Sequence, residues 1–235
     1  MKLLAIETST EACSVALWVD GELRERHEIA PRRHTELVLP WADELLAAAG
    51  VSKTQLDAIA VGRGPGAFTG VRLAVALVQG MALALDVPVV PVSTLAALAM
   101  RAPQDPQARI LAAIDARMGE LYLGLFQRDA EGLALPIGGE WMATPLQASV
   151  PDDIGNFLGV GSGFAAEHGE LARTLGEKLL HADASELPHA SDIARLAVAA
   201  LARGESITAD QLEPAYLRDK VALTLEEQAA ARSLR

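Results

Sequence analysis

The sequence predicts an α/β protein built from two related halves, and three observations support this fold class. A buried strand, a glycine turn and an almost wholly apolar helix follow one another in residues 59–85, a succession typical of α/β folds. Residues 101–109, which include Pro103 and Pro106, form the best linker in the chain. Beyond this linker the opening pattern of the chain starts again, which indicates duplication.

The repeat between the two halves has a constant offset. In the first half the segment LLAIE ends at Glu7 and SVALW begins at Ser14. In the second half LAAID ends at Asp115 and YLGLF begins at Tyr122, so the offset is 108 residues in both cases. A chance match between two apolar hairpins is the alternative explanation, and duplication is the better supported one.

A glycine turn recurs as well, at residues 62–66 and again at residues 159–163, in each case after apolar residues. We therefore expect residues 1–105 to form the first half, which would bind a partner. Residues 106–235 would form a degenerate second half, with the final helix of the chain packing back on the first.

The first half opens with strands and a helix. Apolar stretches separated by short turns predict three strands of a meander, at residues 2–6, 14–19 and 22–29. A helix is expected at residues 34–49, with Thr35 as its N-cap and Gly50 as its C-terminal stop.

The central helix is apolar on every side. We expect Thr69 to be its N-cap, and only Arg72 and Gln79 interrupt the apolar residues up to position 85. A helix that covers a sheet needs one apolar stripe, so the outer side must be buried under its own chain or against another protein. We adopt the second explanation as a hypothesis.

A strand at residues 88–92 and a short helix that ends at Met100 complete the first half. Ser93 or Thr94 is expected to cap this helix. The linker follows directly.

The composition excludes several classes of function. With a net charge of -11, the chain lacks the clustered Lys and Arg that bind nucleic acid phosphates directly. One cysteine, Cys13, rules out an internal disulfide and fits a reducing compartment. No signal peptide precedes the first strand, and the apolar run at residues 71–85 is too short to span a bilayer. We expect a cytoplasmic protein that does not enter membranes.

Two carboxylates stand at corresponding strand ends in the two halves. Glu7 and Asp115 would face each other across a cleft between the halves, where such a pair could hold a hydrated metal and phosphates. The alternative, which we favour, is that both are turn carboxylates that accept backbone amide hydrogen bonds.

Other catalytic signatures are weak or missing. The turn at residues 62–67 fits GxGxxA, but no acidic residue follows the next strand, so a tight strand-to-helix connection is the simpler explanation. The five histidines never occur as HxxxH, HxH or HExxH, and no GxSxG elbow is present. Cys13 is more simply a small buried residue than a nucleophile. We predict no catalytic residue and no metal site.

Several segments together resemble one family. These are LLAIETSTEACSVALW, HTELVLP, GRGPGAFTGVRLAVALVQGMALAL, PVSTLAALA, IDARMGELY and EPAYLRDKVA, spread from Met1 to about Ala222. They are similar to the TsaB family, also called YeaZ, whose members are partners in the biosynthesis of threonylcarbamoyladenosine on tRNA. The resemblance implies an actin-like ATPase fold, shared with sugar kinases and heat-shock chaperones, with two related mixed-sheet halves and a cleft between them.

The resemblance also implies that the chain is not the catalyst. The catalytic paralogue, TsaD, binds its metal through HxxxH shortly after the corresponding strand, where this sequence has Thr94 and Leu98. ATPases of this fold keep glycine after the strand-end acids, whereas here Ser9 and Arg117 stand at those steps. Residues of a degenerate nucleotide cleft would be Glu7, Thr8, Ser9, Thr10, Asp115, Arg117 and Gly161.

The implied function is that of a scaffold. The chain would dimerise with TsaD, or with itself, and act with the ATPase TsaE in modifying the adenosine next to the anticodon of tRNAs that read ANN codons. ATP and a metal would be bound by the partners, and tRNA would be met only through the complex. The alternative is a small-molecule kinase or ATPase that uses the cleft. The predicted partner interface consists of His34, Val38, Trp41, Leu45, Arg72, Val75, Gln79 and Leu83. Whether the tail beyond residue 222 is ordered stays open.

Overall fold

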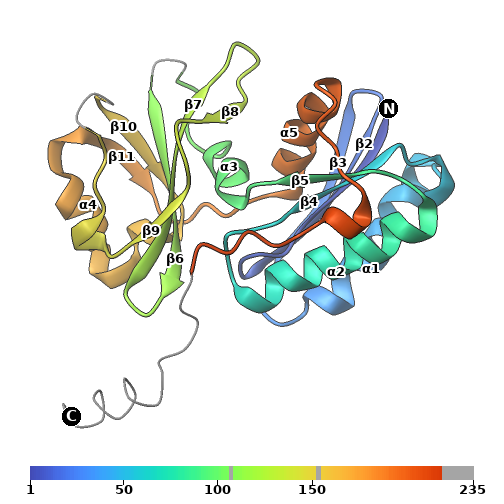
Figure 1. Ribbon diagram of the computed structural model, residues 1–235, viewed down its shortest axis with the longest axis horizontal. Helices are drawn as coiled ribbons and strands as arrows, with labels where there is room; N and C mark the ends of the chain where they lie inside the picture. The colour runs from blue at the N-terminus through green and yellow to red at the C-terminus, as the bar shows by residue number, and fades with distance from the viewer. Residues whose placement is uncertain (106–107, 152–154, 219–235) are drawn as a thin grey trace, which may run out of the picture.

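Two mixed β-sheets lie side by side and form the two halves of the chain (Figure 1). The computed structural model describes residues 1–105, 108–151 and 155–218. The tail beyond residue 222 lies outside these described residues. Each half has helices on both faces of its sheet, as expected of an α/β fold.

The first sheet has the strand order β3-β2-β1-β4-β5. Its strands are β1 (Lys2–Glu7), β2 (Ala12–Val19), β3 (Glu22–Ile29), β4 (Ala58–Gly62) and β5 (Val89–Val92). β1, β2 and β3 form the expected antiparallel meander, whereas β4 and β5 run parallel to β1.

The second sheet has the order β11-β10-β6-β7-β8, with β9 paired to β7. Its strands are β6 (Arg109–Arg117), β7 (Glu120–Arg128), β8 (Ala134–Pro136), β9 (Trp141–Ala143), β10 (Phe157–Val160) and β11 (Leu179–Asp183). Reading from β8 to β11, the order and the strand directions repeat those of the first sheet. The predicted fold class, two related α/β halves that are each built on a mixed sheet, is confirmed.

The repeat is not perfectly regular at the β6–β7 hairpin. Glu7 pairs with Ser14 in the first sheet, but Asp115 pairs with Leu121 in the second, one residue before the position that a constant offset requires. The second hairpin is therefore one residue shorter than the first. Its pairing register also shifts between Asp115 and Arg117.

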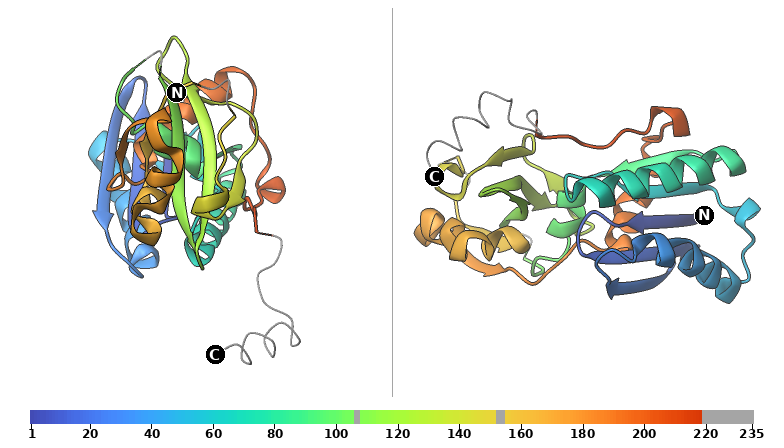
Figure 2. Two further views of the ribbon diagram at one scale, coloured as in Figure 1. Left: turned by 90° about the vertical axis from the view of Figure 1, so that its left-hand side faces the viewer. Right: turned by 90° about the horizontal axis from the view of Figure 1, so that it is seen from below.

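Helices of very different length cover the two sheets. α1 (His34–Ala49) and α2 (Phe68–Leu85) lie on one face of the first sheet, as the view from below shows (Figure 2). α5 (Ala190–Ala202) packs on the other face against β1, β2, β4 and β5, although it follows the second sheet in the chain. α3 (Thr94–Ala99) lies between the halves, and α4 (Glu170–Leu175) covers the second sheet.

Two of the predicted helix caps are wrong. α1 begins at His34 with Arg33 as its N-cap, and α2 begins at Phe68 with Ala67 as its N-cap, so neither predicted threonine is a cap. At α2 the reason is a long-range contact, because Ala67 N–H donates to Ser9 O at 2.7 Å and fixes where the turn ends. Of the two candidates for the α3 cap, Ser93 is the one whose side chain accepts a hydrogen bond, from Ala96 N–H.

By length and composition alone α2 is long enough to cross a membrane, contrary to the expectation from residues 71–85. Its inner side nevertheless belongs to the apolar core between α1, α2 and the first sheet. The core helix of a globular protein passes the same test, and the packing of α2 gives that explanation.

Candidate functional site

Glu7 ends β1 but does not face the cleft between the halves. Its side chain is buried, with 1% of the residue exposed. Ser9 N–H donates to Glu7 Oε1 at 2.6 Å, and Thr94 Oγ1 donates to Oε2 at 3.2 Å. Burial raises the pKa of the Glu7 carboxyl, and these hydrogen bonds only partly offset it. Glu7 therefore has a structural role beneath the turn that joins β1 to β2.

The glycines at the start of α2 pack against this same turn. An added Cβ at Gly62 would overlap with the Glu7 carboxylate, and one at Gly70 would overlap with Thr8 O. At Gly66 it would lie 2.5 Å from Ser9 O. α2 and its preceding loop therefore pack closely on Thr8 and Ser9 on one side of the β1–β2 turn, whereas Ser9, Thr10 and Glu11 line the cleft on the other side. The simpler explanation of the glycines, a close connection, is supported.

Asp115, at the end of β6, is partly exposed and has local partners. Its Oδ1 accepts the Arg117 N–H at 2.7 Å, and its Oδ2 pairs with Arg117 Nη1 at 2.8 Å. Both strand-end carboxylates thus accept backbone amides, as the favoured alternative predicted. The expectation that Glu7 faces Asp115 across the cleft is wrong, because the Glu7 carboxylate is enclosed by Gly62 at the end of β4 and by Thr94 of α3.

Gly161 also has a packing role. An added Cβ there would lie 2.5 Å from Ala113 O and would overlap with the Leu98 side chain, so this glycine allows β10, α3 and β6 to come together. Thr94 and Leu98, at the places of the HxxxH histidines, are both fully buried. Among the described residues no three His, Cys, Asp or Glu side chains are grouped so that they could hold a metal.

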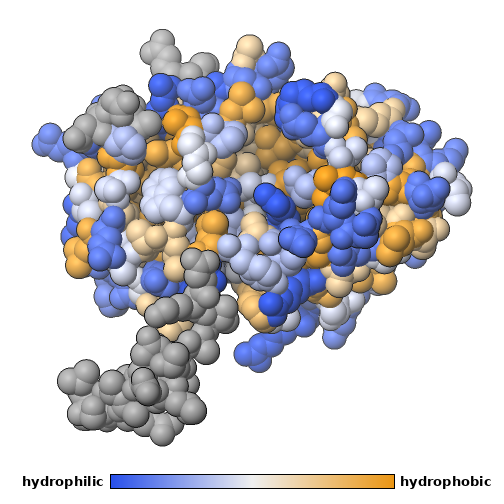
Figure 3. Space-filling view, viewed as in Figure 1, coloured by the Kyte–Doolittle hydropathy of each residue, from blue (hydrophilic) through white to orange (hydrophobic). Residues whose placement is uncertain are grey.

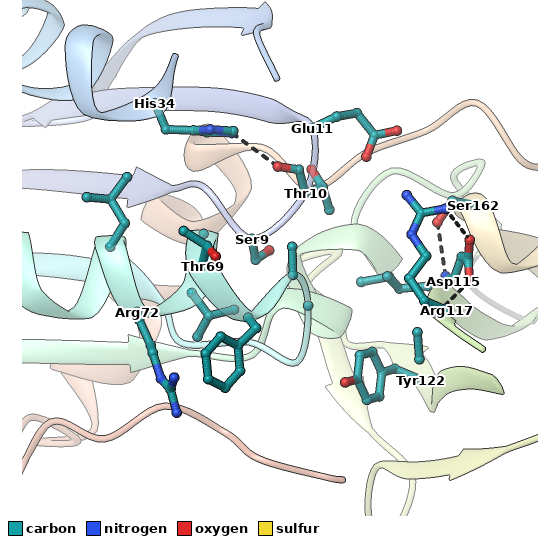
Figure 4. A pocket seen from close by; sticks show the side chains of 18 of the residues that line it. Ser9, Thr10, Glu11, His34, Thr69, Arg72, Asp115, Arg117, Tyr122 and Ser162 are labelled. Carbon is teal, nitrogen blue, oxygen red and sulfur yellow. Dashed lines mark hydrogen bonds and ion pairs between the residues drawn. The ribbon is translucent and has the colours of Figure 1, made fainter. Parts of the chain in front are cut away.

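A cleft of about 1410 Å³ does separate the halves, on the side where α2 begins (Figure 4). One wall holds the start of α1 and α2 with Ser9, Thr10 and Glu11, and the other holds the ends of β6 and the turn at Ser162. The chain is acidic as a whole, but arginines outnumber carboxylates in the lining of this cleft. The lining includes four arginines and two carboxylates: Arg32, Arg72, Arg117 and Arg218, with Glu11 and Asp115. Such a surface favours anions, but it supplies no paired nucleophile and base.

Three of the residues predicted for the partner interface lie in the core instead. Val38 and Leu45 of α1 and Val75 of α2 are buried in the cluster beneath the first sheet, with Val75 5% exposed. The prediction is wrong because a helix with apolar residues on every side has no polar stripe that would reveal its inner face. Helical spacing groups Val75 with Arg72 on the outer side of α2, whereas in the structure Val75 faces the core.

Arg72 and Gln79, two more of the predicted interface residues, are both held by residues 212–218. We call this segment the strap. Gln79 Nε2 donates to Leu212 O at 3.0 Å, and Arg72 Nε donates to the Tyr216 hydroxyl at 2.7 Å. The chain therefore covers one side of α2 itself. His34 is likewise engaged, with Nε2 3.1 Å from Thr10 O.

The strap connects the two halves. Ala215 N–H donates to Arg63 O at 2.8 Å in the first half. At its other end Arg218 Nη2 donates to Ala116 O at 3.0 Å and to Glu120 Oε2 at 2.7 Å in the β6–β7 hairpin. Figures 1 and 2 show the strap beside α2 and reaching the second sheet. EPAYLR carried the family resemblance, but an irregular segment has no periodicity that would indicate its contacts.

One surface of α1 and α2 remains open, and we call it the docking face. It consists of exposed small or apolar residues of α2 and half-buried apolar residues of both helices. These residues are Leu37, Trp41, Ala76, Leu77, Gly80, Met81, Leu83 and Ala84. Leu83 is 69% exposed, and nothing lies within 4 Å of a Cβ placed on Gly80. Apolar and charged residues alternate over the α2 side of the molecule (Figure 3). Trp41 and Leu83 are the predicted interface residues that this face retains.

Comparison with known proteins identifies the family. The family model "TsaD: tRNA N6-adenosine threonylcarbamoyltransferase" matches residues 27–225. The chain is 40% identical to the tRNA threonylcarbamoyladenosine biosynthesis protein TsaB of Escherichia coli, over 94% of this chain and 96% of that protein. The chain belongs to the TsaB family. TsaB is the non-catalytic member of threonylcarbamoyladenosine biosynthesis.

Two further comparisons extend the TsaB assignment. The structure of YeaZ from Pseudomonas aeruginosa is 46% identical and superposes with a TM-score of 0.84, over 92% of this chain and 99% of that one. The tRNA N6-adenosine threonylcarbamoyltransferase of Nitratidesulfovibrio vulgaris is 39% identical over 111 residues, which is 40% of this chain and 31% of that enzyme. This TsaB chain is thus related to the transferase itself over part of its length.

Proposed function

We propose that this TsaB chain is a scaffold subunit that binds TsaD through the docking face. In this role it supports modification of the adenosine next to the anticodon in tRNAs that read ANN codons. The observation that carries the proposal is an open apolar surface on two helices of a chain related to the transferase. Exposed apolar surfaces of this kind on a globular protein usually mark an interface.

The shape of the docking face suits a second helix pair. Ala76, Gly80 and Ala84 follow one another at intervals of four residues and lie on one side of α2. Small side chains there allow another helix axis to come close, while Trp41 and Leu83 supply apolar contact area. Two helices from each related subunit would give a four-helix packing. A second copy of this chain could use the same surface when TsaD is absent.

The chemistry belongs to the partners in this proposal. Glu7 is buried, with its carboxylate hydrogen-bonded to Ser9 and Thr94, so the first half does not present this carboxylate to a metal in the cleft. ATP and the metal would be bound by TsaD and TsaE, and tRNA would be held by the complex rather than by a chain of net charge -11. A cytoplasmic site of action fits the single cysteine, Cys13, whose thiol pKa burial raises to about 12, which makes it unreactive.

The arginines that line the cleft suggest a second candidate function, that of a small-molecule kinase or ATPase. Arg32 and Arg117 could meet phosphates, but the strand-end pair that would hold a hydrated metal is not assembled. Titration calorimetry of the isolated chain with Mg-ATP separates the candidates. Weak or undetectable binding is expected, and a tight, saturable site would favour the kinase or ATPase.

Binding to purified TsaD from the same organism tests the proposal directly. We expect Gly80→Arg to remove binding in titration calorimetry, since it places a long charged side chain in the centre of the docking face. The variant should stay folded, because arginine is a better helix former than glycine. Ala130→Arg, on an exposed loop of the second half, is the matched control and should bind like the wild type. Unchanged binding by Gly80→Arg would place the interface elsewhere.

A further inference from the structure

Arg72 contacts two aromatic side chains, Phe68 and Tyr216, in a stack at the start of α2. Its guanidinium carbon lies 3.3 Å from the centre of the Phe68 ring and 5.3 Å from the centre of the Tyr216 ring. The Tyr216 hydroxyl accepts the Nε hydrogen bond described above. Phe68 and Tyr216 are 50% and 55% exposed. Arg72 is itself exposed, so its charge stays at the surface while these contacts hold the side chain.

The Arg72 guanidinium is held in place but still has N–H groups that can donate hydrogen bonds. Among the described residues, Nε is the only nitrogen of Arg72 with a hydrogen bond acceptor, so Nη1 and Nη2 remain available. A guanidinium edge with two nitrogens matches a carboxylate with two oxygens. Because the rings and the Tyr216 hydroxyl already fix the side chain, binding an anion there would lose little further rotamer entropy.

The stack continues the docking face. Phe68, Arg72, Ala76 and Gly80 follow at intervals of four residues, so they lie along one side of α2. A helix pair that covers Ala76 and Gly80 would therefore reach the stack at the start of α2. Arginine, tyrosine and phenylalanine are also the residue types enriched where interfaces concentrate their binding energy.

We propose that the Phe68–Arg72–Tyr216 stack receives a carboxylate side chain of the protein partner, and so makes the strap part of the interface. The proposal rests on the proposed function, because the partner is the protein that covers the docking face. A partner with an acidic side chain at the end of its own helix pair would form a paired, partly desolvated contact with Arg72. The aromatic rings would then exclude water around it.

A protein carboxylate is favoured over a nucleic acid phosphate by the charge of the surroundings. The chain carries a net charge of -11, which repels a polyanion along its whole length. A protein surface can present one acidic group within an otherwise neutral patch. The apolar residues beside the stack also match a protein surface better than a phosphate backbone.

The test measures affinity for purified TsaD at low and high NaCl concentration. Arg72→Gln should weaken binding by about 10- to 100-fold at low salt and reduce the dependence of affinity on salt. Arg173→Gln, which removes an exposed arginine from α4 in the second half, is the matched control and should leave both quantities unchanged. Gln79→Ala removes the other side-chain contact to the strap and leaves Arg72 in place, so it should change affinity by less than about threefold.

Each outcome separates this inference from the proposed function. If the wild type binds, Gly80→Arg does not, and Arg72→Gln binds like the wild type at both salt concentrations, the docking face stands and the carboxylate contact is wrong. An equal loss in Gln79→Ala and Arg72→Gln would show that only the position of the strap matters. If Arg72→Gln lowers affinity for tRNA and not for TsaD, the stack meets a nucleic acid. A wild type that does not bind TsaD removes both proposals.

Discussion

The two halves share the order and direction of their strands but have different helical layers. In the first half, helices of 16 and 18 residues lie on one face of the sheet and α5 covers the other. In the second half, the strand that corresponds to β4 is followed only by 3₁₀ turns and the six-residue α4. The sheet sets the frame of each half, but the open surface of long helices exists only in the first.

The strand-end carboxylates show the same divergence at one position. Glu7 is buried against Gly62 and Thr94 with its pKa raised, whereas Asp115 has its carboxylate in the cleft beside Arg117. In the first half, Gly66 before α2 and Gly70 within it also close over the turn that follows Glu7. The two strand ends therefore differ in the elements that pack on them, and of the two carboxylates it is Asp115 that lines the cleft.

Val75→Glu should have the largest effect on the first half. It places a carboxylate among buried apolar side chains without a partner, so we expect a loss of about 3–5 kcal/mol in the free energy of unfolding. Ala76→Glu, one residue along the same helix and exposed, is the control and should change stability by less than about 1 kcal/mol. Urea denaturation of both variants measures the difference. Equal stability would mean that α2 is oriented differently.

Gly70→Ala tests the closure of α2 over the β1–β2 turn. The added methyl group overlaps with Thr8 O, a backbone atom that cannot move independently, so a loss of about 2–3 kcal/mol is expected. Gly80→Ala is the same substitution on the same helix in open space, and should stabilise by up to about 1 kcal/mol. Thermal denaturation distinguishes the two. If both variants were stabilised, α2 would not pack on the turn as described.

Glu7→Gln should change how stability depends on pH. The folded-state pKa of Glu7 is raised, so the wild type binds the proton more tightly when folded and loses this contribution as pH rises above about 4.5. Glutamine cannot ionise, so the variant should lose less stability than the wild type between about pH 4 and pH 8. Urea unfolding at several pH values measures the slope. Parallel curves would show that burial of Glu7 does not penalise its charged form.

Local sequence patterns predicted much of this fold. The meander, the helix that ends at Gly50 and the repeat of strands around Glu7 and Asp115 all depend on residues close together in the chain. The resemblance of GPGAFTGVR and DARMGE to one family added the biological context. These features could be predicted because hydrophobic period and turn residues act over a few positions.

The parts that could not be predicted depend on contacts between distant residues. Gly70 looks like any helical glycine until Thr8, 62 positions earlier, is placed against it. α2 has no polar stripe to distinguish its outer side from its inner side, so the sequence alone does not show that Val75 faces the core. Tyr216 reaches Arg72 across 144 positions from an irregular segment, and no periodicity could indicate that pair.

Asp115→Asn should have the smallest effect, and it completes the comparison of the two strand ends. The side chain is partly exposed and its ion-pair partner Arg117 is 81% exposed, so the pair is screened by solvent and should contribute less than about 1 kcal/mol. The backbone amide of Arg117 can still donate to the remaining side-chain oxygen. Thermal denaturation at low and high salt should therefore give nearly the same midpoint as the wild type. A loss as large as that from Gly70→Ala would mean that the turn of the second half is as tightly constrained as that of the first, and that the halves differ only in their helices.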